Sequence, residues 1–217
     1  MSRQSGGLEL GGEAMIYRCL IKLPILGVVI KVFNSYAFDG DLDSDDRCAG
    51  VLAWMKAFLL PFVISAAVSL MLMPETVSKI FPWCSGLDYK IKIMPGDLAT
   101  SILPNLLGFG IGVYALVFAL DSVLVRDLQQ SFQKANETSK ARGSALLLNT
   151  EMALPLVVLT LAIAVGVAQM IFSGSAFLVF FAWFSFWLSL YFILELVNTL
   201  YMMGSAHLSQ SLKQKEH

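Results

Sequence analysis

Few residues in this chain have types and spacings suited to catalysis or metal binding. The most conspicuous set does not match the residue pattern of a calcium-binding loop. Five aspartates crowd one short segment, as they do in calcium-binding loops: Asp39, Asp41, Asp43, Asp45 and Asp46. An EF-hand loop counted from Asp39 requires glycine at its sixth position and glutamate at its twelfth, where this chain has Ser44 and Gly50. We therefore interpret the run as a solvated acidic loop and a candidate contact for a basic partner protein.

The groups that enzymes use are also missing or badly placed. Both histidines, His207 and His217, lie in the polar C-terminal segment, so no apolar stretch contains a histidine base or metal ligand. The three cysteines have no zinc-ligand spacing. The glycine-rich segment 108–112 lies within an apolar stretch, unlike a phosphate-binding loop after a soluble strand. The sequence predicts a protein that is not an enzyme and has no catalytic residues, cofactor or metal.

One carboxylate lies well inside an apolar stretch. Glu195 shares a helical face with Tyr191, Asn198 and Thr199. A charge in the hydrocarbon core is costly, so an intramembrane carboxylate is a candidate for function. Two interpretations stay open, namely a structural or interfacial role near the end of the stretch and a role in a proton or ion pathway.

These residues are positioned by four apolar stretches, 50–73, 98–120, 152–172 and 176–200, each long enough to cross a bilayer. About 20 apolar residues in a helix span the hydrocarbon core. Only 14% of the 217 residues are charged, against about 25% in soluble domains, and the mean hydropathy is +0.70. We predict an all-α polytopic membrane protein with a four-transmembrane-helix bundle at 50–204, followed by a cytoplasmic tail at 205–217.

The distribution of basic residues predicts the orientation of the spans, because lysine and arginine in short loops stay on the cytoplasmic side. Eleven lie before the first stretch, between the second and third, or after the fourth. Three lie between the first and second stretches. Both termini are therefore expected in the cytoplasm. The net charge of −1 gives no reason to expect direct nucleic-acid binding.

Two segments precede the bundle. Residues 1–14 are expected to be a disordered terminus, and we interpret Met15 as the native start, with Met1 as the alternative. Residues 15–49 are expected to be cytoplasmic or interfacial. Within them, 15–33 mixes apolar residues with Arg18, Lys22 and Lys31 around Pro24, which favours an interfacial helix with its basic residues near anionic headgroups. A hydrophobic strand or a helix packed under the bundle is the open alternative.

Small residues mark the expected contact faces of the spans, because lipid gives no hydrophobic drive for helices to associate. The second span has a stripe of them at spacings of three and four, and the third span has a shorter one. Packing within a bundle is favoured over a pore lining. The expected packing residues are Ser101, Asn105, Gly108, Gly112 and Ala115 in the second span, and Ala162, Gly166 and Gln169 in the third.

Two connections are candidates for contacts outside the membrane. Apolar residues continue at four-residue spacing past the second span, which predicts a cytoplasmic helical extension that docks a partner or another copy of the chain. Its contact residues are expected to be Leu124, Leu128 and Phe132. The extracytoplasmic connection 74–97 either senses a stimulus or anchors at the membrane surface. Its aromatic residues include Phe81, Trp83 and Tyr89.

The layout resembles a known family. The size, the four spans, the expected cytoplasmic termini and the segment LPNLLGFGIG at 103–112 are similar to the membrane subunit of the bacterial Kiwa anti-phage defence system, over most of the chain from Met15 onward. The resemblance implies a homo-oligomeric inner-membrane protein that detects phage attack and works with a soluble DNA-binding effector. The sequence also leaves open a small homo-oligomeric ion channel or carrier.

Overall fold

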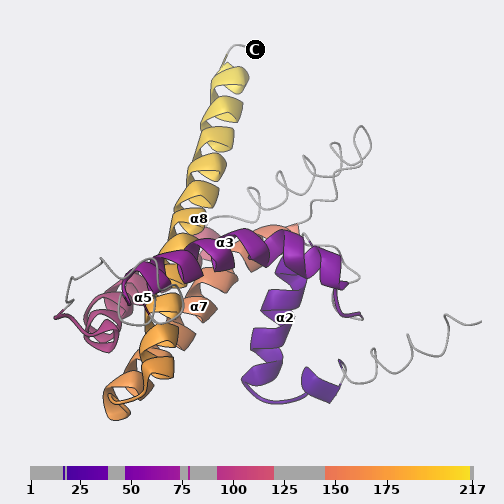
Figure 1. The fold of residues 1–217 in the computed structure, drawn as a ribbon. Coiled ribbons are helices and arrows are strands. Elements are labelled where there is room, and N and C mark those ends of the chain that lie inside the picture. The colour runs from indigo at the N-terminus through magenta and orange to yellow at the C-terminus, as the bar shows by residue number, and fades with distance from the viewer. Residues whose placement is uncertain are drawn as a thin grey trace, which may run out of the picture. The chain divides into compact units, whose positions relative to one another are not determined.

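The computed structural model describes residues 17, 19–38, 47–73, 78, 92–119 and 145–215. Every long element in this part of the chain is an α-helix, as Figure 1 shows. The helices are α2 (Leu26–Ala37), α3 (Val51–Met71), α5 (Pro95–Ala119), α7 (Ala145–Ile171) and α8 (Ala176–Lys215). The predicted all-α class is therefore confirmed.

Four helices are long and apolar enough to cross a membrane, namely Val51–Met71, Pro95–Val117, Leu148–Ile171 and Ala176–Ser205. They coincide with the four predicted spans, and the chain is a multi-pass membrane protein. In a bilayer only helices and closed barrels satisfy every backbone donor and acceptor, so long apolar segments of this composition form helices. Prolines lie inside three of them, at Pro61, Pro104 and Pro155.

The chain divides into two compact units, and the division cuts through two spans. Unit 1 comprises Met1–Leu59 and Phe118–Leu154, and unit 2 comprises Leu60–Val117 and Pro155–His217. The boundaries within α3 and α7 fall next to Pro61 and at Pro155, where the helix lacks a backbone donor. The segment boundaries expected from the sequence stay a prediction, but the compact units do not follow them.

Unit 1 is organised around the side chain of Asn34, which is fully buried on α2. Its Nδ2 donates to the hydroxyl of Tyr17 at 3.0 Å and to the carbonyl of Arg47 at 2.8 Å. Its Oδ1 accepts from the backbone N–H of Ala49 at 2.7 Å. One amide therefore ties α2 to the segment before it and to the segment that leads into α3. We call these three hydrogen bonds the Asn34 clamp.

Aromatic stacking holds the same elements together. Phe33 on α2 stacks on Trp54 and Phe58 in the first turns of α3, with ring centroids 6.5 and 5.4 Å apart, and Tyr36 lies 5.4 Å from Phe58. A further link joins α2 to α7, because the hydroxyls of Ser35 and Thr150 are 2.9 Å apart. Such aromatic pairs contribute beyond their buried area, so α2 is a packed element of unit 1.

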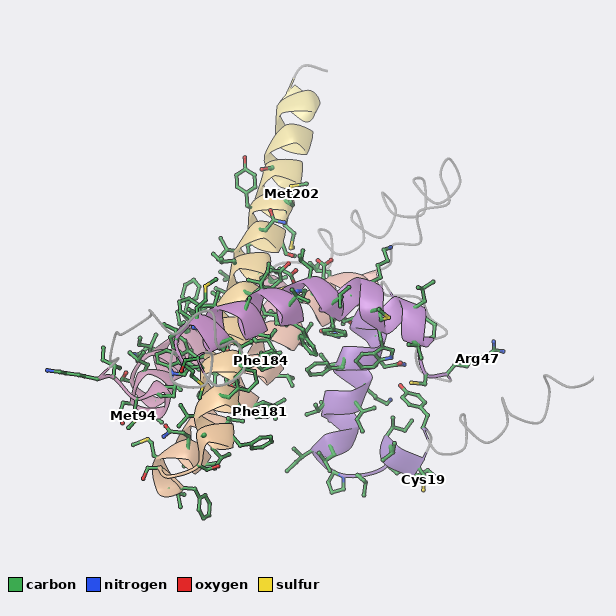
Figure 2. All side chains as sticks on the ribbon, viewed as in Figure 1. Cys19, Arg47, Met94, Phe181, Phe184 and Met202 are labelled. Carbon is green, nitrogen blue, oxygen red and sulfur yellow. The ribbon has the colours of Figure 1, made fainter. Side chains whose placement is uncertain are left out.

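Unit 2 has a separate apolar core formed by α5, α7 and α8. Each helix contributes two of its most buried members: Ala99, Leu103, Leu159, Ala162, Trp183 and Phe186. Residues at the end of α3, Leu72 and Met73, pack against this cluster. Phe62 of α3 also meets Phe184 of α8 edge to face, at 5.6 Å; Phe184 is labelled in Figure 2. The hydroxyls of Ser69 and Ser189 donate hydrogen bonds to backbone carbonyls one turn earlier in their own helices.

The N-terminal helix differs from its prediction in its bounds. A helix was expected across 15–33, but the chain turns between Ile21 and Ile25, around Pro24, and α2 runs from Leu26 to Ala37. Proline disfavours the helical conformation of the residue before it and donates no hydrogen bond, so the helix restarts after it. The alternative of a strand at 26–37 is excluded.

Replacing Asn34 with alanine should destabilise unit 1, because the buried N–H of Ala49 loses its acceptor and α2 loses its clamp. An unsatisfied buried donor costs about 1–3 kcal/mol. We expect a lower melting temperature for the Asn34→Ala protein in detergent, measured by intrinsic tryptophan fluorescence. The matched control is Asn105→Ala, since the exposed Asn105 amide makes only a 3.4 Å hydrogen bond to Ser101 of its own helix. Equal shifts for both variants would contradict the clamp.

Candidate functional site

Two of the four polar residues predicted on the fourth span, Tyr191 and Glu195, form a hydrogen-bonded pair on α8. The hydroxyl of Tyr191 hydrogen-bonds the carboxylate of Glu195 one turn away, and both side chains are half-buried. Thr199 is half-buried on the following turn, and Asn198 beside it is exposed. A hydroxyl that donates to a carboxylate stabilises its charged form, which lowers the cost of placing that charge in a membrane helix.

The chemistry open to this pair is limited to proton uptake or weak cation binding. Within the described ranges, no group of three or more histidine, cysteine, aspartate or glutamate side chains gathers into a metal site. A single carboxylate supplies too few ligands for a structural metal site of the usual kind. The structural and proton-pathway interpretations of Glu195 both stay predictions.

A close helix contact in unit 2 joins the start of α5 to the end of α7. Gln169 of α7 is 1% exposed, and its Oε1 accepts from the N–H of Gly96 at 3.0 Å. This bond satisfies one of the donors that the first turn of a helix leaves free. A Cβ built on Gly96 would lie 2.7 Å from the carbonyl oxygen of Gly166, and one on Gly166 would lie 2.7 Å from the Cβ of Ala99. Only glycine fits at these two positions.

The structure places the small residues predicted on the two spans very differently. Ala162, Gly166 and Gln169 of α7 are all buried. The predicted set on α5 is exposed throughout: Ser101, Asn105, Gly108, Gly112 and Ala115. A Cβ built on Gly108 or Gly112 would meet nothing within 4 Å.

The face of α5 that packs within the chain is the opposite one. Its buried residues recur at spacings of three, four and seven: Gly96, Ala99, Leu103, Gly110 and Val117. Both stripes have helical periodicity, so periodicity alone did not separate them. The predicted role of the exposed stripe in helix packing stays a prediction.

Sequence reasoning missed the Asn34 clamp entirely. The available signal was the one amide side chain in the mainly apolar sequence of α2, since a polar side chain buried among apolar ones needs partners. It also missed two buried polar atoms, Ser65 Oγ and Trp187 Nε1, that have no hydrogen-bond partner in the part of the chain that the structure describes.

Three groups of predicted residues lie outside the described ranges. They are the acidic loop (Asp39, Asp41, Asp43, Asp45 and Asp46), the cytoplasmic extension (Leu124, Leu128 and Phe132) and the extracytoplasmic aromatic residues (Phe81, Trp83 and Tyr89). The expected disordered terminus 1–14 also lies outside them.

No protein-family model matches the chain, and no curated protein or solved structure matches it either.

The packing geometry predicts that a glycine-to-valine substitution lowers the melting temperature at Gly166 but not at Gly112. Gly166→Val should separate α5 from α7 and lower the melting temperature in detergent, because the added side chain overlaps Ala99. Overpacking of this kind costs about 1–3 kcal/mol. Gly112→Val should leave the melting temperature of the monomer nearly unchanged, because nothing lies near its Cβ position. Similar losses at both positions, with the oligomeric state unchanged, would contradict the assigned packing face.

Proposed function

We propose that the chain is a membrane-embedded sensor or anchor subunit of a bacterial anti-phage defence complex, and that it recruits or regulates a soluble DNA-binding effector at the inner membrane. Homo-oligomer formation and cytoplasmic termini belong to this proposal. The role that we propose for the chain is not enzymatic. Three features support the proposal: the four-span architecture, the resemblance of the 103–112 segment and layout to the Kiwa membrane subunit, and the continuity of the helix α8.

The continuity of α8 is the observation that carries the proposal. α8 contains 40 residues, which at 1.5 Å per residue make it about 60 Å long. Figure 1 shows it as one unbroken helix. The hydrocarbon core is about 30 Å thick, so roughly half of α8 projects beyond it. A shift of the span then moves the projecting segment as part of the same rigid element. The helix therefore links the intramembrane Tyr191–Glu195 pair to a polar surface where a soluble protein can bind.

In this mechanism, a change at the envelope alters the packing of the bundle. Pro104 is exposed within α5 and lies beside Asn105 and the outward-facing glycines, where the backbone lacks one hydrogen bond. A change of helix geometry there would alter the surface that α5 presents. The cytoplasmic segments would then change their hold on the effector, with the acidic loop and the extension after the second span as the proposed contacts.

The alternative is a small homo-oligomeric ion channel or carrier, and Glu195 is the residue that favours it. Against it, each span contains a single charged residue, namely Lys56 in α3, Asp97 in α5, Glu151 in α7 and Glu195 in the spanning part of α8. Conduction requires a series of polar or charged ligands along a path. Such sparse charge favours the sensor or anchor.

The primary test is an affinity purification of the tagged, detergent-solubilised protein from its native host, with mass spectrometry of what binds. We expect a stoichiometric soluble partner with a DNA-binding domain. Substituting the five aspartates with asparagine should weaken its recovery, because the contact is assigned to their charge. A tagged, unrelated four-span protein serves as the control. Recovery of the chain alone, as a discrete oligomer, would contradict the proposal and favour the channel.

A flux measurement separates the two candidates independently. Liposomes containing the purified protein should conduct ions or protons no faster than empty liposomes, because the spans lack a series of charged ligands. Flux that is present in the wild-type protein and lost in Glu195→Gln would overturn the sensor proposal. The Tyr191→Phe variant is the matched control, since it removes the hydroxyl but keeps the carboxylate.

A further inference from the structure

The turn that leads into α2 exposes a group of large apolar side chains. Ile25 is 80% exposed, Val28 61%, Leu26 57% and Leu23 45%. A soluble surface seldom gathers this much apolar area in so short a segment. The group, which we call the α2 tip, lies entirely within unit 1.

The α2 tip has a defined shape. The N–H groups of Leu26 and Gly27 donate to the carbonyls of Pro24 and Leu23, both at 2.8 Å. A Cβ on Gly27 would overlap the Ile21 carbonyl, so the turn packs tightly against itself. Ile25 has a φ of 69°, which a β-branched residue adopts only when its surroundings enforce it. The hydrogen bonds and the Gly27 contact hold these apolar side chains outward.

The Asn34 clamp fixes the C-terminal end of α2 near the point where α3 enters the membrane, and the tip lies at the other end of α2. Arg47 and Ala49, the clamp residues, lie just before α3 begins at Val51. Figure 1 shows α2 crossing the beginning of α3 steeply instead of running alongside it. Spans are tilted on average by only about 20° from the membrane normal. A helix that crosses the first turns of a span therefore runs close to the plane of the membrane surface.

The charges around the tip fit an anionic surface. Residues 17–38 contain three basic residues, Arg18, Lys22 and Lys31, and no aspartate or glutamate. Lys22 is exposed within the turn, and Lys31 is exposed on α2.

We propose that the α2 tip inserts into the leaflet at which α3 begins, and that Lys22 and Lys31 bind anionic phospholipid headgroups there. The occupant is the bilayer because α2 is held at the start of α3 and runs close to the membrane surface, so its other end, the tip, lies at that surface too. Apolar residues with flanking lysines are the composition of segments that lie in the headgroup region. The inference goes beyond the proposed function and is independent of it, since it requires no effector.

The test places an environment-sensitive NBD label at Ile25→Cys in a full-length protein whose three native cysteines are serine. The protein is reconstituted into phosphatidylcholine liposomes with or without phosphatidylglycerol, and nitroxide groups on the acyl chains serve as quenchers. We expect blue-shifted emission and quenching, with more quenching in the anionic liposomes. An unchanged melting temperature shows that the label leaves unit 1 folded.

Neutralising the lysines tests the headgroup contact. In anionic liposomes, Lys22→Gln and Lys31→Gln should each reduce the insertion equilibrium, read from the quenched fraction, about fivefold. They should have little effect in neutral liposomes. The matched control for the Lys22→Gln, Lys31→Gln double variant is Lys213→Gln with Lys215→Gln, which removes the same two charges near the end of α8.

Three results would overturn the proposal. Water-like emission without quenching would show that the tip is solvated. Blue-shifted emission without quenching by lipid nitroxides would show that protein, such as a second copy of the chain, covers it. Quenching that responds equally to both lysine pairs would show that the headgroup contact is not local.

Discussion

The hydrocarbon core offers no hydrogen-bond partner, and this constraint governs nearly every polar group in the described spans. Hydroxyls turn back to carbonyls of their own helix, as Ser69, Thr160 and Ser189 do. The Gln169 amide satisfies the first turn of α5 instead of leaving it open. Tyr191 binds the Glu195 carboxylate. Ser65 Oγ and Trp187 Nε1 depart from the rule among the described residues, and their burial costs free energy.

The same constraint explains why the sequence predicts so much of the fold. The four spans follow from the length and apolarity of their segments, because a bilayer leaves helix as the structure available to them. The bounds of α2 did not follow, although Pro24 marked the break. The decisive property there was local, since the turn depends on Gly27 lying against the Ile21 carbonyl.

Contacts between helices were far less predictable than the helices themselves. On α5 the outward stripe of glycines looks more like a packing face than the buried one, which includes Leu103 and Val117. Which stripe faces the chain depends on shape at the crossing, where Gly96 and Gly166 meet. That information is divided between residues about 70 positions apart, so a pattern within one span cannot reveal it. The Asn34 clamp is a similar case, because two of its three bonds are to backbone groups whose position no side-chain pattern records.

The division of α3 and α7 between the two units has a consequence for synthesis. Unit 1 needs residues from both ends of a long stretch of chain, since Ser35 on α2 bonds Thr150 on α7. Thr150 follows Ser35 by 115 residues, so α2 emerges from the ribosome well before its partner on α7 is translated. The first two spans therefore enter the membrane before unit 1 can close, and α2 must wait beside α3, held by the Asn34 clamp and its aromatic contacts, until the third span arrives.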